Sequence, residues 1–134
     1  MKTNDLRIGN WIADRGLKEW QIDHWETINK VSSKASTSMF MGIMMETHPL
    51  TEYVDYLRPI PLTEEWLLKF GAINNSRFWL LDKIELGHIT TDDYYEFEWQ
   101  TPLLDWEITP IKYVHTLQNL YWCLCGEELK IKLQ

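Results

Sequence analysis

The sequence is poor in the residues and motifs from which catalytic sites are usually built. Its two cysteines are too few for a disulfide framework, and its six glycines form no glycine-rich phosphate loop. It contains neither a nucleophile elbow nor a Walker motif. The longest apolar run, Met39–Met45, has seven residues and is too short to span a bilayer as a helix. No long apolar stretch follows the first residues, so we expect no secretory signal, no membrane association and a cytoplasmic protein with reduced thiols.

The histidines and cysteines lack the spacing of a metal or nucleophile site. No two of the four histidines are four residues apart, the spacing of a helical zinc pair. Cys123 and Cys125 lie on an expected helix about 200° apart around its axis, so they cannot readily share a metal. His115 lies eight or ten residues before them, too far along the helix to activate either thiol. We therefore expect no enzymatic activity, no metal and no cofactor.

The composition is that of a folded chain. Apolar residues make up 45% of the sequence and there are eight tryptophans, which favours a packed core over disorder. There is no internal repeat and no linker able to separate two parts. We therefore predict a single domain over residues 1–134.

The acidic charge is confined to one stretch. Eight of the twenty acids and one of the thirteen bases lie between Asp82 and Glu107, and the remainder balances at twelve of each. Such a field repels nucleic-acid phosphates and attracts cations or basic surfaces of partner proteins. The alternative interpretation is a solvated face that only keeps the protein in solution.

Residues 1–62 are predicted to be mostly β-structure. Leu6–Asp14 is predicted to be a strand, and Asp14-Arg15-Gly16 has turn chemistry. Glu19–Val31 is rich in Trp, Ile and Thr, which favours a second strand. Around His24 neither strand face is cleanly apolar, which indicates a weak strand or a β-bulge. These pieces favour either an antiparallel sheet or a small SH3-like barrel.

The clearest local signal predicts a short central helix at residues 63–71. Pro59 and Pro61 force an extended approach to it. Thr63 is a good N-cap, and Gly71 can end the helix in the left-handed conformation.

The strand Tyr94–Gln100 has the most regular alternation in the chain. Aromatic residues alternate with polar ones, which puts the rings on a core face and Glu96 and Glu98 on a solvent face. The turn before it holds Asp92 and Asp93. We expect the acidic excess to lie largely on this one surface.

The remaining C-terminal elements complete an α+β fold. Antiparallel strands are predicted over residues 77–109 and a longer helix over residues 110–125, packed on the sheet by an apolar stripe. Thr109 can cap this helix, and Pro110 suits its first position. Alternating apolar and charged residues predict a final strand over residues 128–133.

One ridge of the longer helix is a candidate interaction surface. His115, Asn119 and Trp122, at positions i, i+4 and i+7, share this ridge, away from the apolar stripe. A Trp on a polar ridge is a common anchor at protein interfaces, although a second packed layer would also explain it. The candidate binding residues for a protein partner are therefore His115, Asn119, Trp122, Glu96, Glu98, Asp92 and Asp93.

Two other functions remain as alternatives. The acidic segment could mimic nucleic acid and occupy a DNA-binding host protein. The tryptophans could instead line a carbohydrate site, in an enzyme or a binder. Direct binding of nucleic acid is not expected, because residues 1–67 hold seven bases and ten acids. The sequence leaves the oligomeric state open.

Four blocks of the sequence carry a family resemblance. Leu6–Trp11, Pro59–Gly71, Ile111–Tyr121 and Gly126–Leu129 resemble, in this order, a group of small uncharacterised proteins. These proteins belong to Bacteroidetes genomes and to their phages or mobile elements. The resemblance implies inheritance with mobile DNA and carries no catalytic residue across.

Overall fold

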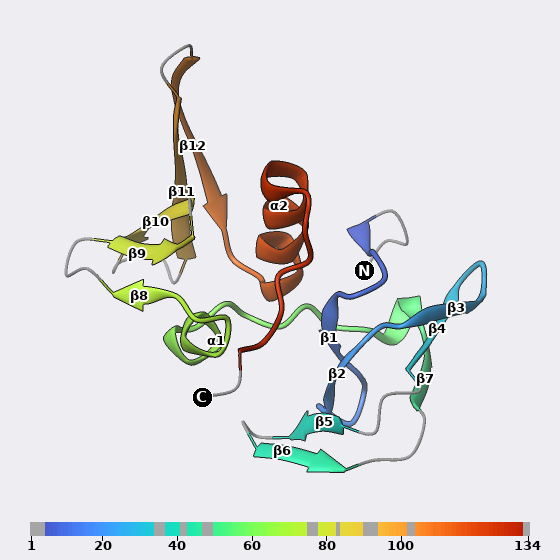
Figure 1. Ribbon diagram of the computed structural model, residues 1–134. Coiled ribbons are helices and arrows are strands. Elements are labelled where there is room, and N and C mark those ends of the chain that lie inside the picture. The colour runs from blue at the N-terminus through green and yellow to red at the C-terminus, as the bar shows by residue number, and fades with distance from the viewer. Residues whose placement is uncertain are drawn as a thin grey trace. The chain divides into compact units, whose positions relative to one another are not determined.

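The structure, a computed structural model, belongs to the α+β class that the sequence predicts (Figure 1). It describes residues 5–33, 37–40, 43–46, 50–74, 78–82, 84–89, 94–101 and 104–132. The chain divides into two compact units, Met1–Ile60 and Pro61–Gln134, which are described in turn. The single domain over residues 1–134 stays a prediction.

The regular secondary structure in the described part of the first unit is mostly β-strand, as predicted. Short strands pair antiparallel into two sheets, in the orders β1-β2-β5-β6 and β3-β4-β7. The bounds are β1 Trp11–Ala13, β2 Glu19–Gln21, β3 His24–Thr27, β4 Lys30–Ser33, β5 Thr37–Phe40, β6 Ile43–Glu46, β7 Leu50–Tyr53 and the 3-10 helix η2 Val54–Tyr56.

The chain passes from the first sheet to the second through a very short connection. Only Ile22 and Asp23 separate β2 in the first sheet from β3 in the second. After η2 the chain returns to β1, where Ala13 and Arg58 exchange backbone hydrogen bonds of 3.0 and 2.8 Å. Of the two predicted arrangements, an antiparallel sheet or a small SH3-like barrel, the described residues form open antiparallel sheets.

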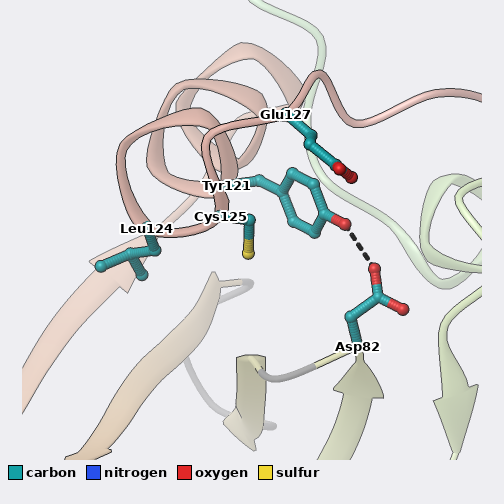
Figure 2. A pocket seen from close by; sticks show the side chains of 5 residues that line it. All are labelled: Asp82, Tyr121, Leu124, Cys125 and Glu127. Carbon is teal, nitrogen blue, oxygen red and sulfur yellow. Dashed lines mark hydrogen bonds between the residues drawn. The ribbon is translucent and has the colours of Figure 1, made fainter.

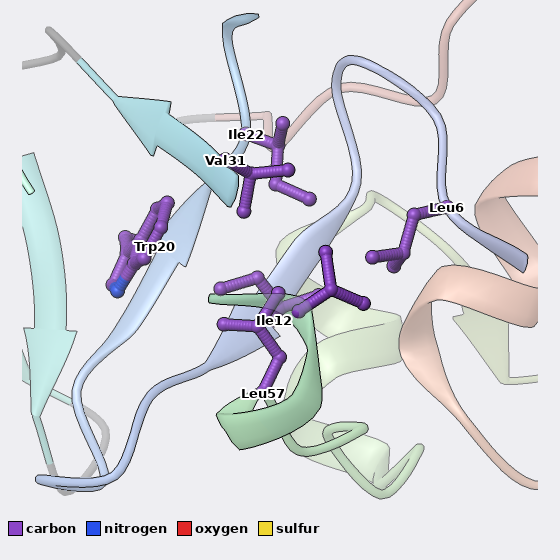
Figure 3. Packing of buried hydrophobic residues seen from close by; sticks show 7 residues of the cluster. Leu6, Ile12, Trp20, Ile22, Val31 and Leu57 are labelled. Carbon is purple, nitrogen blue, oxygen red and sulfur yellow. The ribbon is translucent and has the colours of Figure 1, made fainter. Parts of the chain in front are cut away.

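A hydrophobic cluster lies between these strands (Figure 3). Trp20 and Ile22 point to the same side of their segment because side chains alternate along extended backbone. Both are 1% exposed or less, and such burial of large apolar groups is the main favourable term in folding. The buried members are Leu6, Ile12, Trp20, Ile22, Val31, Val54 and Leu57.

The second unit combines one sheet with two helices. The sheet is antiparallel, in the order β12-β11-β10-β9-β8, so β12 and β8 are its edge strands. The bounds are α1 Glu64–Lys69, β8 Ile73–Asn74, β9 Phe78–Leu81, β10 Ile84–Ile89, β11 Tyr94–Thr101, β12 Leu104–Ile111 and α2 Val114–Cys125.

The short central helix is confirmed as α1. Thr63 is the N-cap, and its hydroxyl accepts a hydrogen bond of 3.4 Å from the backbone N–H of Trp66. The helix ends at Lys69, two residues before Gly71, whose φ of 84° lies in the left-handed region. The backbone N–H of Gly71 donates to the carbonyl of Leu68, which satisfies a C-terminal carbonyl of the helix.

The predicted start of the longer helix is wrong. Thr109 and Pro110 belong to strand β12, and α2 begins at Val114 after Tyr113 as N-cap. A proline is tolerated here because β12 is an edge strand, so the missing N–H removes no ladder bond on its outer side. The end is as predicted, with Gly126 at a φ of 70°.

The predicted final strand is also wrong. Residues 128–132 form no strand, although Leu129 is buried at 2% exposure. The backbone N–H of Lys132 donates instead to the carbonyl of Lys69 at 2.8 Å. The apolar alternation therefore reflects a segment that covers the end of α1, because a strand needs a ladder partner.

Candidate functional site

Register places three glutamates on one face of the five-stranded sheet. Glu98 of β11 lies directly opposite Glu85 of β10, and Glu96 lies opposite Gly87. Residues two apart along a strand share a face, so Glu96 and Glu98 belong to the same face as Glu85. These three glutamates are called the acidic face below.

The other face of this sheet carries the core of the second unit. Leu86 of β10 pairs with Trp79 of β9 and with Phe97 of β11, while Ile84 pairs with Leu81. By register, the acidic face is therefore the face opposite the one that carries this core. The buried residues of the core face, each 4% exposed or less, are Trp79, Leu81, Ile84, Leu86 and Ile111.

The part of the predicted acidic site in the preceding turn cannot be placed, because Asp92 and Asp93 lie outside the described residues. The binding role of Glu96 and Glu98 stays a prediction. The strand register locates both of them, and it adds Glu85, which strand alternation within β11 alone could not have found.

A pocket of about 450 Å³ opens where α2 meets the turn between β9 and β10 (Figure 2). The ring of Tyr121 projects from the helix toward Asp82, and Glu127 follows just beyond the helix end. None of its described lining residues is basic. The lining residues are Asp82, Tyr121, Leu124, Cys125 and Glu127.

Asp82 owes its position to a tight turn. It follows β9 directly and has a φ of 52°, in the left-handed region that two-residue hairpin loops require. Aspartate tolerates this region better than most side chains. The turn therefore presents a carboxylate at the pocket without needing glycine.

The Tyr121 hydroxyl donates a hydrogen bond to the Asp82 carboxylate. This bond, followed by burial of the phenol, raises the pKa of Tyr121 well above its ordinary value, because ionisation would place two negative charges together. Tyr121 therefore stays a neutral donor at physiological pH and fixes the carboxylate in place.

The pocket is electrostatically suited to a cation. Two carboxylates, Asp82 and Glu127, line it beside the aromatic ring of Tyr121. It also lies at the C-terminal end of α2, the negative end of the helix dipole, and the last turn of α2 has no basic residue. An ammonium or guanidinium group would meet favourable charge and an aromatic face there.

The predicted ridge on the longer helix is only partly at the surface. Trp122 is 44% exposed and Asn119 is half-buried, but His115 is buried at 7% exposure and stacks on the Tyr113 ring. The expectation that His115 lies on the non-core side is therefore wrong. Gln118 is also buried, so the core-facing stripe of α2 is displaced toward His115 relative to the predicted apolar stripe.

Four of the six tryptophans with described side chains are core residues. Trp11, Trp20, Trp66 and Trp79 are 5% exposed or less, so their rings cannot stack on a sugar at the surface. Among tryptophans with described side chains, Trp122 is the one with a large exposed area. Burial thus weakens the carbohydrate alternative.

A polar cluster around His24 in the first unit was missed by sequence reasoning. The imidazole Nδ1 contacts the Asp23 carboxylate, and Nε2 lies 2.7 Å from Glu26 Oε1. Ser32 donates to the same Glu26 oxygen at 3.0 Å, and its hydroxyl lies 2.6 Å from that of Thr51. The sequence signal was the irregular alternation around His24, which here marks a β-bulge between Trp25 and Thr27.

Comparisons with known proteins add no assignment. The sequence matches no family model and no curated protein, and the structure matches no solved structure. Within the described residues, no helix is long and apolar enough to cross a membrane. In that part of the chain, no three His, Cys, Asp or Glu side chains are grouped so that they could hold a metal ion. A function therefore has to rest on the geometry of these sites.

Proposed function

We propose that the chain is a non-enzymatic interaction module that binds a basic protein partner through the acidic face. The single observation that carries this proposal is the register that sets Glu85 opposite Glu98, with Glu96 two residues away. Like charges directly opposite each other in a sheet are destabilising. A basic surface docked on this face would relieve that repulsion.

The segregation of charge supports the same partner chemistry. The Asp82–Glu107 segment carries the whole acidic excess of the chain, and the acidic face lies within it. A field of one sign steers an oppositely charged protein and raises its association rate. We expect the complex to weaken as salt is added, because exposed charges are screened within about 10 Å at 0.1 M salt.

The pocket at the end of α2 offers a place for one side chain of the partner. Its 450 Å³ exceeds the size of a single lysine or arginine side chain, and the Asp82 and Glu127 carboxylates would receive the charged end. Leu124 and the Tyr121 ring would contact the aliphatic stem. Such an anchored side chain in a lined pocket is typical of interface hot spots.

The sequence resemblance sets the proposed context. We propose a protein of phage or mobile-element origin that acts in the cytoplasm of its host. Mimicry of nucleic acid uses the same acidic face and is a special case, in which the basic partner is a DNA-binding protein. Competition between DNA and the chain for the captured partner would identify this case.

The test compares two variants of equal charge. Glu85→Gln/Glu98→Gln removes two charges from the acidic face, and Asp55→Asn/Glu64→Gln removes two exposed charges elsewhere. Binding of an arginine- and lysine-rich peptide would be measured by calorimetry at low and at physiological salt. We expect the first variant to weaken binding about tenfold and the control to change it far less. Equal losses in both variants would contradict a localised site.

A further inference from the structure

A row of hydrogen-bonding side chains crosses the β3-β4-β7 sheet of the first unit. Register aligns His24 with Ser32 and Ser32 with Thr51, so the three residues share one line across the strands. Their hydrogen bonds join this line to Glu26 and Asp23. These five residues are called the His24 row below.

The geometry of the row fits a protonated imidazole. Both ring nitrogens of His24 face carboxylates, Asp23 at Nδ1 and Glu26 at Nε2. A neutral imidazole has one N–H and can donate to only one of these carboxylates, whereas the protonated ring donates to both. Loss of the proton therefore removes one of the two hydrogen bonds and one attractive charge.

A backbone irregularity brings Glu26 into this arrangement. The pairing of β3 with β4 shifts register between Trp25 and Thr27, so Glu26 is the extra residue of a bulge. Bulges commonly change the direction of a side chain. Here the Glu26 carboxylate forms hydrogen bonds with the His24 ring and with the Ser32 hydroxyl. The Ser32–Glu26 bond connects β3 to β4 through side chains.

The His24 row matters for stability because it begins on a strand at the edge of its sheet. β3 is an edge strand, held in its sheet by β4 on one side. Its hairpin turn with β4 carries Ile28, which is 91% exposed and adds no packing. Besides the ladder with β4 and the packing of Trp25 against the hydrophobic cluster, interactions within the row are a further tie that holds this edge in place.

We infer that the His24 row is a proton-dependent clasp on the β3 edge. When His24 is protonated, it neutralises Asp23 and Glu26 and holds Glu26 in position to receive Ser32. When His24 loses its proton, the two carboxylates face a neutral ring, and the β3 edge opens more often. The clasp rests on the first unit alone and is independent of the proposed function.

The charged groups around His24 fix the direction of the effect. Asp23 and Glu26 come from the β3 segment, Lys30 of β4 acts on Glu26, and Thr51 of β7 is neutral. Hydrogen bonds with Asp23 and then Glu26 raise the pKa of His24 above its usual 6.5. The stabilisation is therefore complete below pH 6.5 and is lost as pH rises through the higher value of the folded protein.

The first measurement is an NMR titration of the His24 imidazole in the full chain. We expect a midpoint above 6.5 that falls in Asp23→Asn and in Glu26→Gln. Asp55→Asn, an exposed carboxylate in η2 of the same unit, should leave the midpoint unchanged. A wild-type midpoint at or below 6.5 would overturn the clasp.

The second measurement is hydrogen exchange of the backbone amides of β3 and β4 and of Asp23, whose N–H donates to the backbone carbonyl of Ser32 at 3.0 Å. After correction for intrinsic rates, protection should fall about threefold or more as pH rises through the His24 midpoint, the factor expected for one lost hydrogen bond. His24→Gln should abolish this pH dependence. Wild-type protection that stays constant across the midpoint would refute the inference even if that variant fails to fold.

Discussion

The hydroxyl of Tyr121 donates a hydrogen bond to the carboxylate of Asp82, and it thereby joins the C-terminal helix to the hairpin turn of the five-stranded sheet. The two residues are 39 positions apart in sequence. Asp82 is held in a left-handed conformation and Tyr121 is 6% exposed, so both ends of the bond are fixed. The bond shapes the pocket in which we place a basic group of the partner.

Removal of this hydrogen bond should lower stability modestly. Tyr121→Phe keeps the buried ring and deletes the donor, so we expect a loss of about 1 kcal/mol in the free energy of unfolding. Urea denaturation would measure it. Tyr113→Phe, at a ring that is 37% exposed, is the matched control and should change stability by less than about 0.5 kcal/mol. Equal effects of the two substitutions would show that the bond contributes nothing.

The same bond predicts the alkaline titration of Tyr121. Because Asp82 raises the pKa of Tyr121 in the folded protein, folding stabilises the protonated phenol. The contribution is complete below pH 10, the ordinary value, and is lost as pH rises above it. Phenolate absorbance should show one tyrosine that ionises later than the others, and Asp82→Asn should bring it back toward them. A late tyrosine that persists in Asp82→Asn would have another cause.

The two helix-ending glycines should respond alike to alanine. Gly71 and Gly126 have φ of 84° and 70°, so alanine at either position costs about 1 kcal/mol of backbone strain. A Cβ at Gly71 would also lie 2.6 Å from Lys132 Cδ, but this flexible side chain can move away. Urea denaturation of Gly71→Ala and Gly126→Ala should give similar losses. A loss above about 3 kcal/mol at Gly71 alone would mean that Lys132 is held rigidly.

Two isoleucines of the first unit, one in the core and one at the surface, allow a direct comparison. Ile22 is 1% exposed and belongs to the hydrophobic cluster, whereas Ile28 is 91% exposed at a turn. Ile22→Ala should therefore cost about 2–5 kcal/mol, and Ile28→Ala less than about 0.5 kcal/mol. Chemical denaturation followed by tryptophan fluorescence would measure both. A small loss at Ile22 would contradict the packing of this cluster.

Local sequence signals predicted those elements whose causes are local. Thr63 as cap and Gly71 as terminator sit within a few residues of α1, so the helix could be identified from the chain alone. Strand β11 was predicted for the same reason, because its alternation is a local property. Thr109 and Pro110 gave an equally good local signal for a helix start, but pairing with β11 placed them in an edge strand.

The candidate sites depended on contacts that sequence spacing does not contain. Glu85 joins Glu98 through cross-strand register, and Asp82 meets Tyr121 across 39 residues. His115 was assigned to the wrong side of α2 because Gln118 and His115 are polar residues that pack inward. Polarity alone therefore did not predict the burial of these two side chains.

The most direct test of the acidic face maps where a basic ligand binds. Backbone amide resonances of the full chain would be followed by NMR during titration with an arginine- and lysine-rich peptide. The account predicts shifts concentrated on β10 and β11 around Glu85, Glu96 and Glu98, and on the Asp82 turn, which fade as salt is added. Shifts confined to the first unit, or spread evenly over both units, would contradict it.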